Sequence, residues 1–180
     1  AFNGCSLLES ITIPDMVTKI YSSTFASCAS LRDVVIPLGV TEIEREAFFF
    51  CKSLREVVIP SSVAKIGRDA FYCCAGLEKL AISEGVTMIG RSAFSGCKSL
   101  REVVVPSSVK TIGEFAFNEC YGLEKLVISK GVKEICKGAF AYCYGLREVV
   151  IPSSVNTIGS CAFALCPSLE IVHLPASLSS

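Results

Sequence analysis

The sequence has no excess of charge of either sign. Lysine and arginine number 17, aspartate and glutamate also number 17, and the formal net charge is therefore zero. A nucleic-acid-binding surface needs a basic excess on one face, and a polybasic membrane anchor needs a basic cluster. The charge balance argues against both kinds of partner.

Long apolar runs are also missing, although 51% of the residues are hydrophobic and the mean hydropathy is +0.55. The longest runs contain six residues, as in residues 70–75 and 161–166, whereas a membrane-spanning helix needs roughly 18. The sequence therefore predicts no transmembrane segment and a core distributed along the whole chain. It has no Asn-x-Ser/Thr sequon, initiator methionine or signal peptide. Because it opens in mid-pattern at Ala1, we interpret it as an excerpt of a longer protein.

Motifs for catalysis and ligand binding are absent too. His173 is the only histidine, so the Ser–His and Cys–His arrangements that activate a nucleophile have no second candidate base. Glycines are spread singly rather than grouped in a phosphate-binding loop, acidic residues form no cluster, and no C-x-x-C or other zinc spacing occurs. We expect no enzyme activity, no cofactor and no metal.

What is present is a repeat of 23 residues that runs from end to end without insertion or deletion. Phenylalanine recurs at Phe2, Phe25, Phe48, Phe71, Phe94, Phe117, Phe140 and Phe163. A cysteine follows three residues after each phenylalanine, and a leucine three residues after each cysteine. The unit reads A-F-x-x-C-x-x-L-x-x-V-x-I-P-x-x-V-x-x-I-G-x-x. Periods of this length are typical of solenoids.

Each part of the unit has a structural interpretation. The segment L-x-x-V-x-I alternates apolar residues and favours a short strand, which the proline ends because proline cannot donate to a ladder. V-x-x-I adds two inward side chains across a turn, and A-F-x-x-C favours a single helical turn. One unit cannot bury its apolar edge alone, so stacked units share one core.

The unit resembles the 23-residue repeat A-F-x-x-C-x-x-L-x-x-I-x-I-P of the BspA-like, Treponema pallidum type, leucine-rich-repeat family. The resemblance covers essentially the whole chain. It implies a right-handed leucine-rich-repeat superhelix of mainly short parallel β-strands with single helical turns, forming one domain over residues 1–180 with seven to eight units. It also implies a surface or secreted adhesion role, because family members are mostly surface proteins that bind host or matrix proteins. Ser83 and Ser129 depart from the pattern by replacing the proline.

Alternate units are more alike than adjacent ones, so the duplication unit is 46 residues. Leu54-Arg55-Glu56 reappears at Leu100 and Leu146, whereas Leu77-Glu78-Lys79 reappears at Leu123. In a parallel ladder, the two positions after each leucine then form rows of alternating sign. We predict two such charge ladders, interrupted where Arg32 precedes Arg55 and Asp33 precedes Glu56. They are solvated strand-flanking charges or, alternatively, readers of a charged partner.

Eight of the eleven cysteines occupy one position of the repeat. Such a position predicts buried free thiols, because a buried thiol acts as a small apolar group whose weak donor can reach a carbonyl. Disulfides and metal ligation are the alternatives. The predicted internal thiol ladder comprises Cys28, Cys51, Cys74, Cys97, Cys120 and Cys143. Cys73, Cys136 and Cys161 lie off the ladder and are the candidates for reactivity.

The side chain between the two inward residues of each strand should point to solvent. This column contains five valines at Val35, Val58, Val104, Val127 and Val150, together with Thr12, Ala81 and His173. A contiguous exposed apolar stripe is a common sign of an interaction surface, whereas β-propensity in a stacked sheet is the alternative reason for valine. Tyr121, Tyr142 and Tyr144 gather near two turns and would extend such a surface.

The function predicted from these features is a protein-binding leucine-rich-repeat module. By resemblance its context is a cell-surface or secreted adhesion-type protein. The alternative is a structural scaffold subunit of an intracellular multiprotein assembly in a reducing compartment, which free thiols fit equally well. Uncovered end rungs also predict end-to-end self-association of this segment. The partner's identity is not encoded in the repeat.

Overall fold

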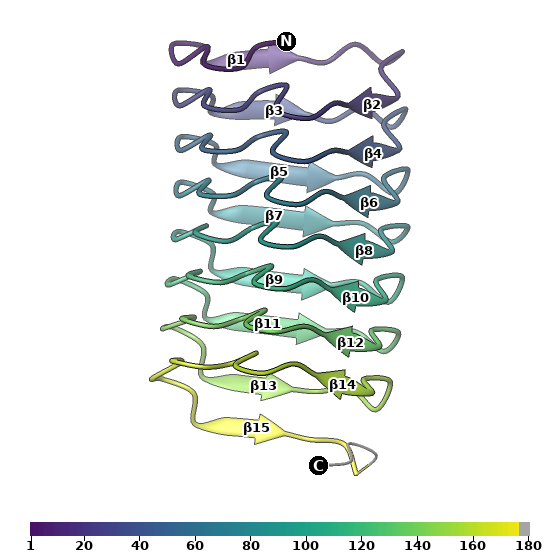
Figure 1. The fold of residues 1–180 in the computed structure, drawn as a ribbon, viewed down its shortest axis with the longest axis vertical. Coiled ribbons are helices and arrows are strands. Elements are labelled where there is room, and N and C mark those ends of the chain that lie inside the picture. The colour runs from purple at the N-terminus through teal and green to yellow at the C-terminus, as the bar shows by residue number, and fades with distance from the viewer. Residues whose placement is uncertain (177–180) are drawn as a thin grey trace.

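The computed structural model describes residues 1–176, and the last four residues of the predicted solenoid, 177–180, lie outside the described part. The chain winds into stacked rungs, each with a longer strand, a short strand and a turn segment that leads to the next rung (Figure 1). Every strand pairs in parallel with strands 23 residues away. The predicted leucine-rich-repeat solenoid of short parallel strands is confirmed.

The strands fall into two series that alternate along the chain. The longer strands are β1 (Ser10–Thr12), β3 (Asp33–Val35), β5 (Glu56–Ile59), β7 (Lys79–Ile82), β9 (Glu102–Val105), β11 (Lys125–Ile128), β13 (Glu148–Val150) and β15 (Ile171–His173). The short strands are β2 (Lys19–Ile20), β4 (Glu42–Ile43), β6 (Lys65–Ile66), β8 (Met88–Ile89), β10 (Thr111–Ile112), β12 (Glu134–Ile135) and β14 (Thr157–Ile158).

One continuous core fills the space enclosed by the rungs. Its thickest column is the phenylalanine repeat, in which successive rings stack with centroids 5.0–5.5 Å apart and planes within 16° of parallel. Phe48, Phe71, Phe94, Phe117 and Phe140 are completely buried. Because the repeat has a constant length, each side chain packs against its own equivalent in the next rung, and the solenoid is held by columns of identical contacts.

The predicted single helical turn at A-F-x-x-C is wrong, and no residue in the range 1–176 is helical. Two residues per turn segment have positive φ, as at Glu46 (58°) and Phe50 (59°), whereas a right-handed helical turn needs negative φ throughout. The amides of Phe48 and Phe50 donate to the carbonyls of Ala70 and Tyr72 in the next rung, at 2.7 and 2.8 Å. The turn segments are therefore hydrogen-bonded across rungs, as the strands are.

The two strand series differ in continuity. The short strands form one seven-stranded sheet, whereas the longer strands divide into β1-β3-β5-β7, β9-β11 and β13-β15. Within the first of these groups, β3 and β5 share only the pair Asp33↔Glu56. The longer strands thus fall into four doublets (β1/β3, β5/β7, β9/β11 and β13/β15), of which the first two are joined by that single pair, and Figure 1 shows wider gaps between the doublets. The 46-residue period of the sequence is therefore also a period of the sheet.

Proline accounts for part of this pattern. Ser83 and Ser129, which replace proline, donate their backbone N–H groups to the carbonyls of Ile59 and Val105, both at 3.1 Å. Their doublets, β5/β7 and β9/β11, have four residue pairs, whereas β1/β3 and β13/β15 have three. Pro106 and Pro152 occupy the same position at the next interfaces and have no N–H to donate, and no ladder forms there.

Candidate interaction surface

The outer face of the longer strands carries the stripe of valines. Their exposed fractions range from 40% at Val127 to 72% at Val35, with Val58, Val104 and Val150 between these values. Alternation along each strand explains this, since the neighbouring valines turn inward and are buried. Thr12, Ala81 and His173 continue the same column and are exposed as well. The structure therefore places all eight positions on one face of the solenoid.

Charged rows lie beside the stripe, and their ion pairs follow the doublets. Lys79 Nζ lies 3.9 Å from Glu56, Lys125 Nζ lies 2.6 Å from Glu102, and Arg101 contacts Glu124. In β13/β15, Nε2 of the stripe residue His173 lies 3.2 Å from Glu148, a contact that is an ion pair only when the histidine is protonated. Among residues 1–176, no ion pair joins longer strands of different doublets. The predicted ladders of alternating sign are thus present as separate pairs rather than as continuous rows.

Two of the gaps between doublets form shallow hollows on this face. The hollow between β7 and β9 has a volume of about 420 Å³ and is lined by Glu78, Lys79, Leu80, Arg101, Glu102 and Val104. Between β3 and β5 lies a hollow of about 300 Å³, lined mostly by apolar side chains that include Val35, Leu38 and Val58. The outer face is therefore grooved across the stripe, with a charged groove and an apolar one.

The six predicted ladder cysteines are completely buried. Each Sγ donates to the phenylalanine carbonyl of the preceding rung at 3.1–3.4 Å, as from Cys97 to Phe71. Burial raises the pKa of the Cys51 and Cys120 thiols to about 12 and raises that of Cys97 strongly. All eleven cysteines are free thiols, so the ladder consists of protonated donors in the core.

The cysteines outside the ladder lie in more open surroundings. Cys161 is exposed, with a φ of 58°, whereas Cys73 and Cys136 are half-buried. Burial raises the pKa of Cys136 to about 11 and also raises that of Cys73. A raised pKa lowers the fraction of reactive thiolate at Cys73 and Cys136, and Cys161 is the most exposed of the three. Within residues 1–176, no three Cys, His, Asp or Glu side chains gather in a group that could hold a metal ion.

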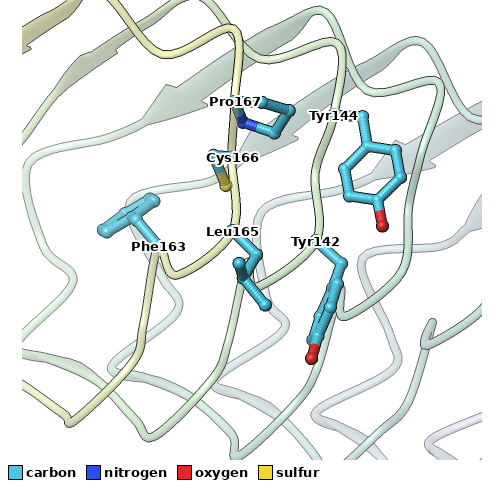
Figure 2. A pocket seen from close by; sticks show the side chains of 6 residues that line it. All are labelled: Tyr142, Tyr144, Phe163, Leu165, Cys166 and Pro167. Carbon is cyan, nitrogen blue, oxygen red and sulfur yellow. The ribbon is translucent and has the colours of Figure 1, made fainter.

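Aromatic side chains form two clusters beside the turn segments. The Tyr121 and Tyr144 rings stack with centroids 4.8 Å apart, and Tyr142 lies 6.4 Å from Tyr144. Figure 2 shows the hydroxyls of Tyr142 and Tyr144 pointing the same way, beside a hollow of about 640 Å³ that Leu165 also lines. The structure thus brings together the three tyrosines singled out from the sequence.

A second aromatic cluster contains a residue that the repeat pattern did not reveal. Phe49 stacks on Tyr72 at 5.2 Å, and Phe50 lies 4.6 Å from Phe49. Phe50 takes a position that glycine, serine or cysteine occupies in neighbouring rungs. Only its consecutive run with Phe48 and Phe49 marked it in the sequence.

The repeat and the rung geometry together define a leucine-rich-repeat solenoid, and the comparisons with known proteins identify its family. The model of the BspA type leucine rich repeat region, six copies, matches residues 1–78 and 64–180. The chain therefore belongs to the BspA type leucine-rich-repeat family. No helix in residues 1–176 is long and apolar enough to cross a membrane.

Solved structures of bacterial proteins share this fold. A leucine-rich repeat protein from Eubacterium ventriosum is 30% identical with a TM-score of 0.86, and the match covers 95% of this chain and 45% of that protein. The Treponema pallidum leucine rich repeat protein is 29% identical with a TM-score of 0.82, covering 90% and 78%. A leucine rich cell surface protein from Faecalibacterium prausnitzii is 29% identical with a TM-score of 0.58, covering 98% and 56%. A search among curated proteins found no match.

Proposed function

We propose that this solenoid is a protein-binding module and that the outer face of its longer strands is the binding surface. The observation that supports this most directly is the exposure of five valines in one column, 40–72% each, on a face that meets solvent. Exposed apolar side chains in register present a contiguous surface whose burial by a partner is favourable. The repeat supplies it at a fixed spacing along the whole rod.

The grooves and charges give this surface features that a partner would recognise. Ion pairs border the valines within β5/β7 and β9/β11, and the hollow between β7 and β9 exposes Lys79, Arg101 and Glu102. Interfaces commonly combine an apolar centre with a charged rim that fixes orientation. The outer face of the longer strands has both elements, at intervals set by the doublets.

The proposed setting is a surface or secreted protein of adhesion type. It is supported by family membership and by the likeness to the cell surface protein from Faecalibacterium prausnitzii. The second candidate is a scaffold subunit of an assembly inside the cell. It is favoured by the eleven free thiols, because thiols persist in reducing compartments.

A triple substitution of Val58, Val104 and Val150 to lysine tests the surface. The matched control places three lysines on exposed positions beside or in the short strands, at Ala64, Thr87 and Thr157. Binding to immobilised extracellular-matrix proteins is measured for the unaltered chain, the triple variant and the control. We expect the triple variant alone to lose binding, by about tenfold or more, because buried lysines leave unpaired charge in the interface.

Two results would contradict the proposal in different ways. Undiminished binding by the triple variant, with circular dichroism unchanged, would exclude the valine face. Stoichiometric capture of the source cell's own proteins from its lysate, without binding to matrix proteins, would replace the adhesion setting with the scaffold role. If that capture were lost in the triple variant, the valine face would remain the binding surface.

A further inference from the structure

One surface turn of the solenoid holds a carboxylate. The turn Pro106-Ser107-Ser108-Val109 follows β9, and the carboxylate of Glu84 from the preceding rung sits over it. The backbone N–H groups of Ser107 and Ser108 donate to Glu84 Oε1 and Oε2, at 3.0 and 2.9 Å. The Ser107 hydroxyl donates to both oxygens, at 3.0 and 3.1 Å. Two adjacent amides and a hydroxyl thus form a cradle for an anion.

The same turn recurs two rungs later as Pro152-Ser153-Ser154-Val155, and two backbone hydrogen bonds of the first turn have counterparts there. The amide of Gly131 donates to Ser154 Oγ at 3.0 Å, as that of Gly85 donates to Ser108 Oγ at 3.0 Å. The amide of Val155 donates to the carbonyl of Pro152 at 3.0 Å, as that of Val109 does to Pro106 at 3.2 Å. The two turns therefore have matching backbones.

They differ in the residue that precedes the glycine. Where Glu84 covers the first turn, the second has Lys130, and both side chains are exposed. Within residues 1–176, neither the Ser153 nor the Ser154 amide donates to another protein group. The second turn therefore has the same backbone donors, and a lysine takes the repeat position of the residue that supplies the internal carboxylate.

We propose that the Ser153–Ser154 turn, with Lys130, binds a carboxylate of a ligand in the position that Glu84 takes over Ser107 and Ser108. The planar group with two oxygens matches two amides and one hydroxyl, and Lys130 supplies the compensating charge. The hydrogen bonds of the Glu84 turn also lower the pKa of that carboxyl, the Ser107 amide most of all. The ligand is an acidic side chain or chain terminus of a peptide, or a small free carboxylate. This site is independent of the valine face.

The chain contains its own controls for this site. Lys130→Glu should fill the turn internally, as Glu84 does, and Glu84→Lys should open the turn at Ser107 and Ser108. Both substitutions lie at exposed positions, so the fold should be retained. Amide resonances of the full chain are followed by two-dimensional NMR during titration with sodium acetate, with sodium chloride at equal ionic strength as reference.

We expect the Ser153 and Ser154 amides of the unaltered chain to shift and saturate with acetate, while those of Ser107 and Ser108 stay constant. Lys130→Glu should weaken the response about tenfold or more, and Glu84→Lys should transfer it to Ser107 and Ser108. Titration with a peptide that contains one aspartate, and with the same peptide carrying asparagine instead, distinguishes a peptide ligand from a small free carboxylate. Tighter binding than acetate indicates a peptide ligand, and equal binding indicates a small carboxylate. Shifts that match those with chloride, or a response unchanged in Lys130→Glu, would overturn the site.

Discussion

The two strand series of this solenoid are built from the same 23-residue period, yet the short strands form one continuous sheet and the longer strands are divided into doublets. In the short-strand sheet, the residue directly after each strand from β4 onward donates its backbone N–H to a carbonyl of the preceding rung. Gly67 donates to the carbonyl of Ile43 at 2.7 Å, and Cys136 donates to that of Ile112 at 2.9 Å. In the longer-strand sheet the equivalent residue is usually proline, and only Ser83 and Ser129 donate. The missing donor explains part of this difference, since β1/β3 and β13/β15 still pair although Pro37 and Pro175 occupy the equivalent position.

This difference shows how a constant repeat length can produce uneven rungs. The core columns of phenylalanine and thiol are the same at every interface, so they hold the rungs at one register. The backbone ladder on one side can therefore be interrupted without loss of the stack. The gaps between β3 and β5 and between β7 and β9 become grooves across the valine face, and these two grooves lie two rungs apart.

Alkaline pH should remove the difference between the sheets by disrupting the core that they share. Burial raises the pKa of Cys51 and Cys120 to about 12, whereas the pKa of a thiol in the unfolded chain is about 8.5. The folded form therefore keeps its protons longer, and stability is complete below about pH 8.5 and falls as pH rises toward 12. Each thiol lowers the free energy of unfolding by about 1.4 kcal/mol per pH unit in this window.

Urea unfolding followed by circular dichroism from about pH 8 to about pH 10 measures this loss. Several buried thiols act together, so the total effect should exceed that of any surface substitution. Cys97→Ala is the control, since it removes one titrating group and should make the pH dependence shallower by one thiol's contribution. Equal slopes for the two proteins would mean that the ladder thiols do not titrate on unfolding.

Much of this architecture follows from the sequence because the repeat is regular. A Phe, Cys or Leu every 23 residues can be buried only if the rungs stack in register, so the solenoid, its core columns and the outward valine positions could be predicted. The conformation of the turn segment, by contrast, does not follow from the repeat period. Backbone φ values at Glu46 and Phe50 are positive although neither residue is glycine, and the cross-rung hydrogen bonds that hold them depend on the next rung.

Removing the backbone N–H donor from an interface within a doublet, or adding one at an interface between doublets, should move the boundary of a doublet. Ser129→Pro removes the hydrogen bond from Ser129 to Val105 and should cost at least about 0.5–1.5 kcal/mol. Pro106→Ser supplies an N–H facing Ile82 and should add a similar amount, partly offset by about 0.4–1 kcal/mol from the freer unfolded chain.

Native-state hydrogen exchange provides the measurement. Amides of β11 should exchange faster in Ser129→Pro, and amides of β9 more slowly in Pro106→Ser. Ser129→Ala keeps the backbone donor and serves as the control, with exchange expected to resemble that of the unaltered chain. If Ser129→Ala speeds exchange as much as Ser129→Pro, the hydroxyl rather than the amide maintains the doublet.

The doublets explain why the charge rows were only partly predictable. Sequence alone places Glu56, Lys79, Glu102 and Lys125 in one row of alternating sign, and each would have a partner on both sides in an even ladder. The structure pairs Lys79 with Glu56 and Lys125 with Glu102, because the gap between β7 and β9 interrupts the row. The carboxylate held by Ser107 and Ser108 was also not predictable, since it depends on the direction of a surface side chain.

The smallest expected effect distinguishes a divided charge row from a continuous one. A double-mutant cycle on Lys125 and Glu102, within a doublet, should give a coupling of about 0.2–1 kcal/mol that decreases in high salt. A second cycle on Lys125 and Glu148, across the gap between β11 and β13, should give a coupling near zero. Thermal unfolding of single and double Lys/Glu exchanges measures both. Equal couplings would show that the charges act across the gap and that the doublet boundary concerns only the backbone.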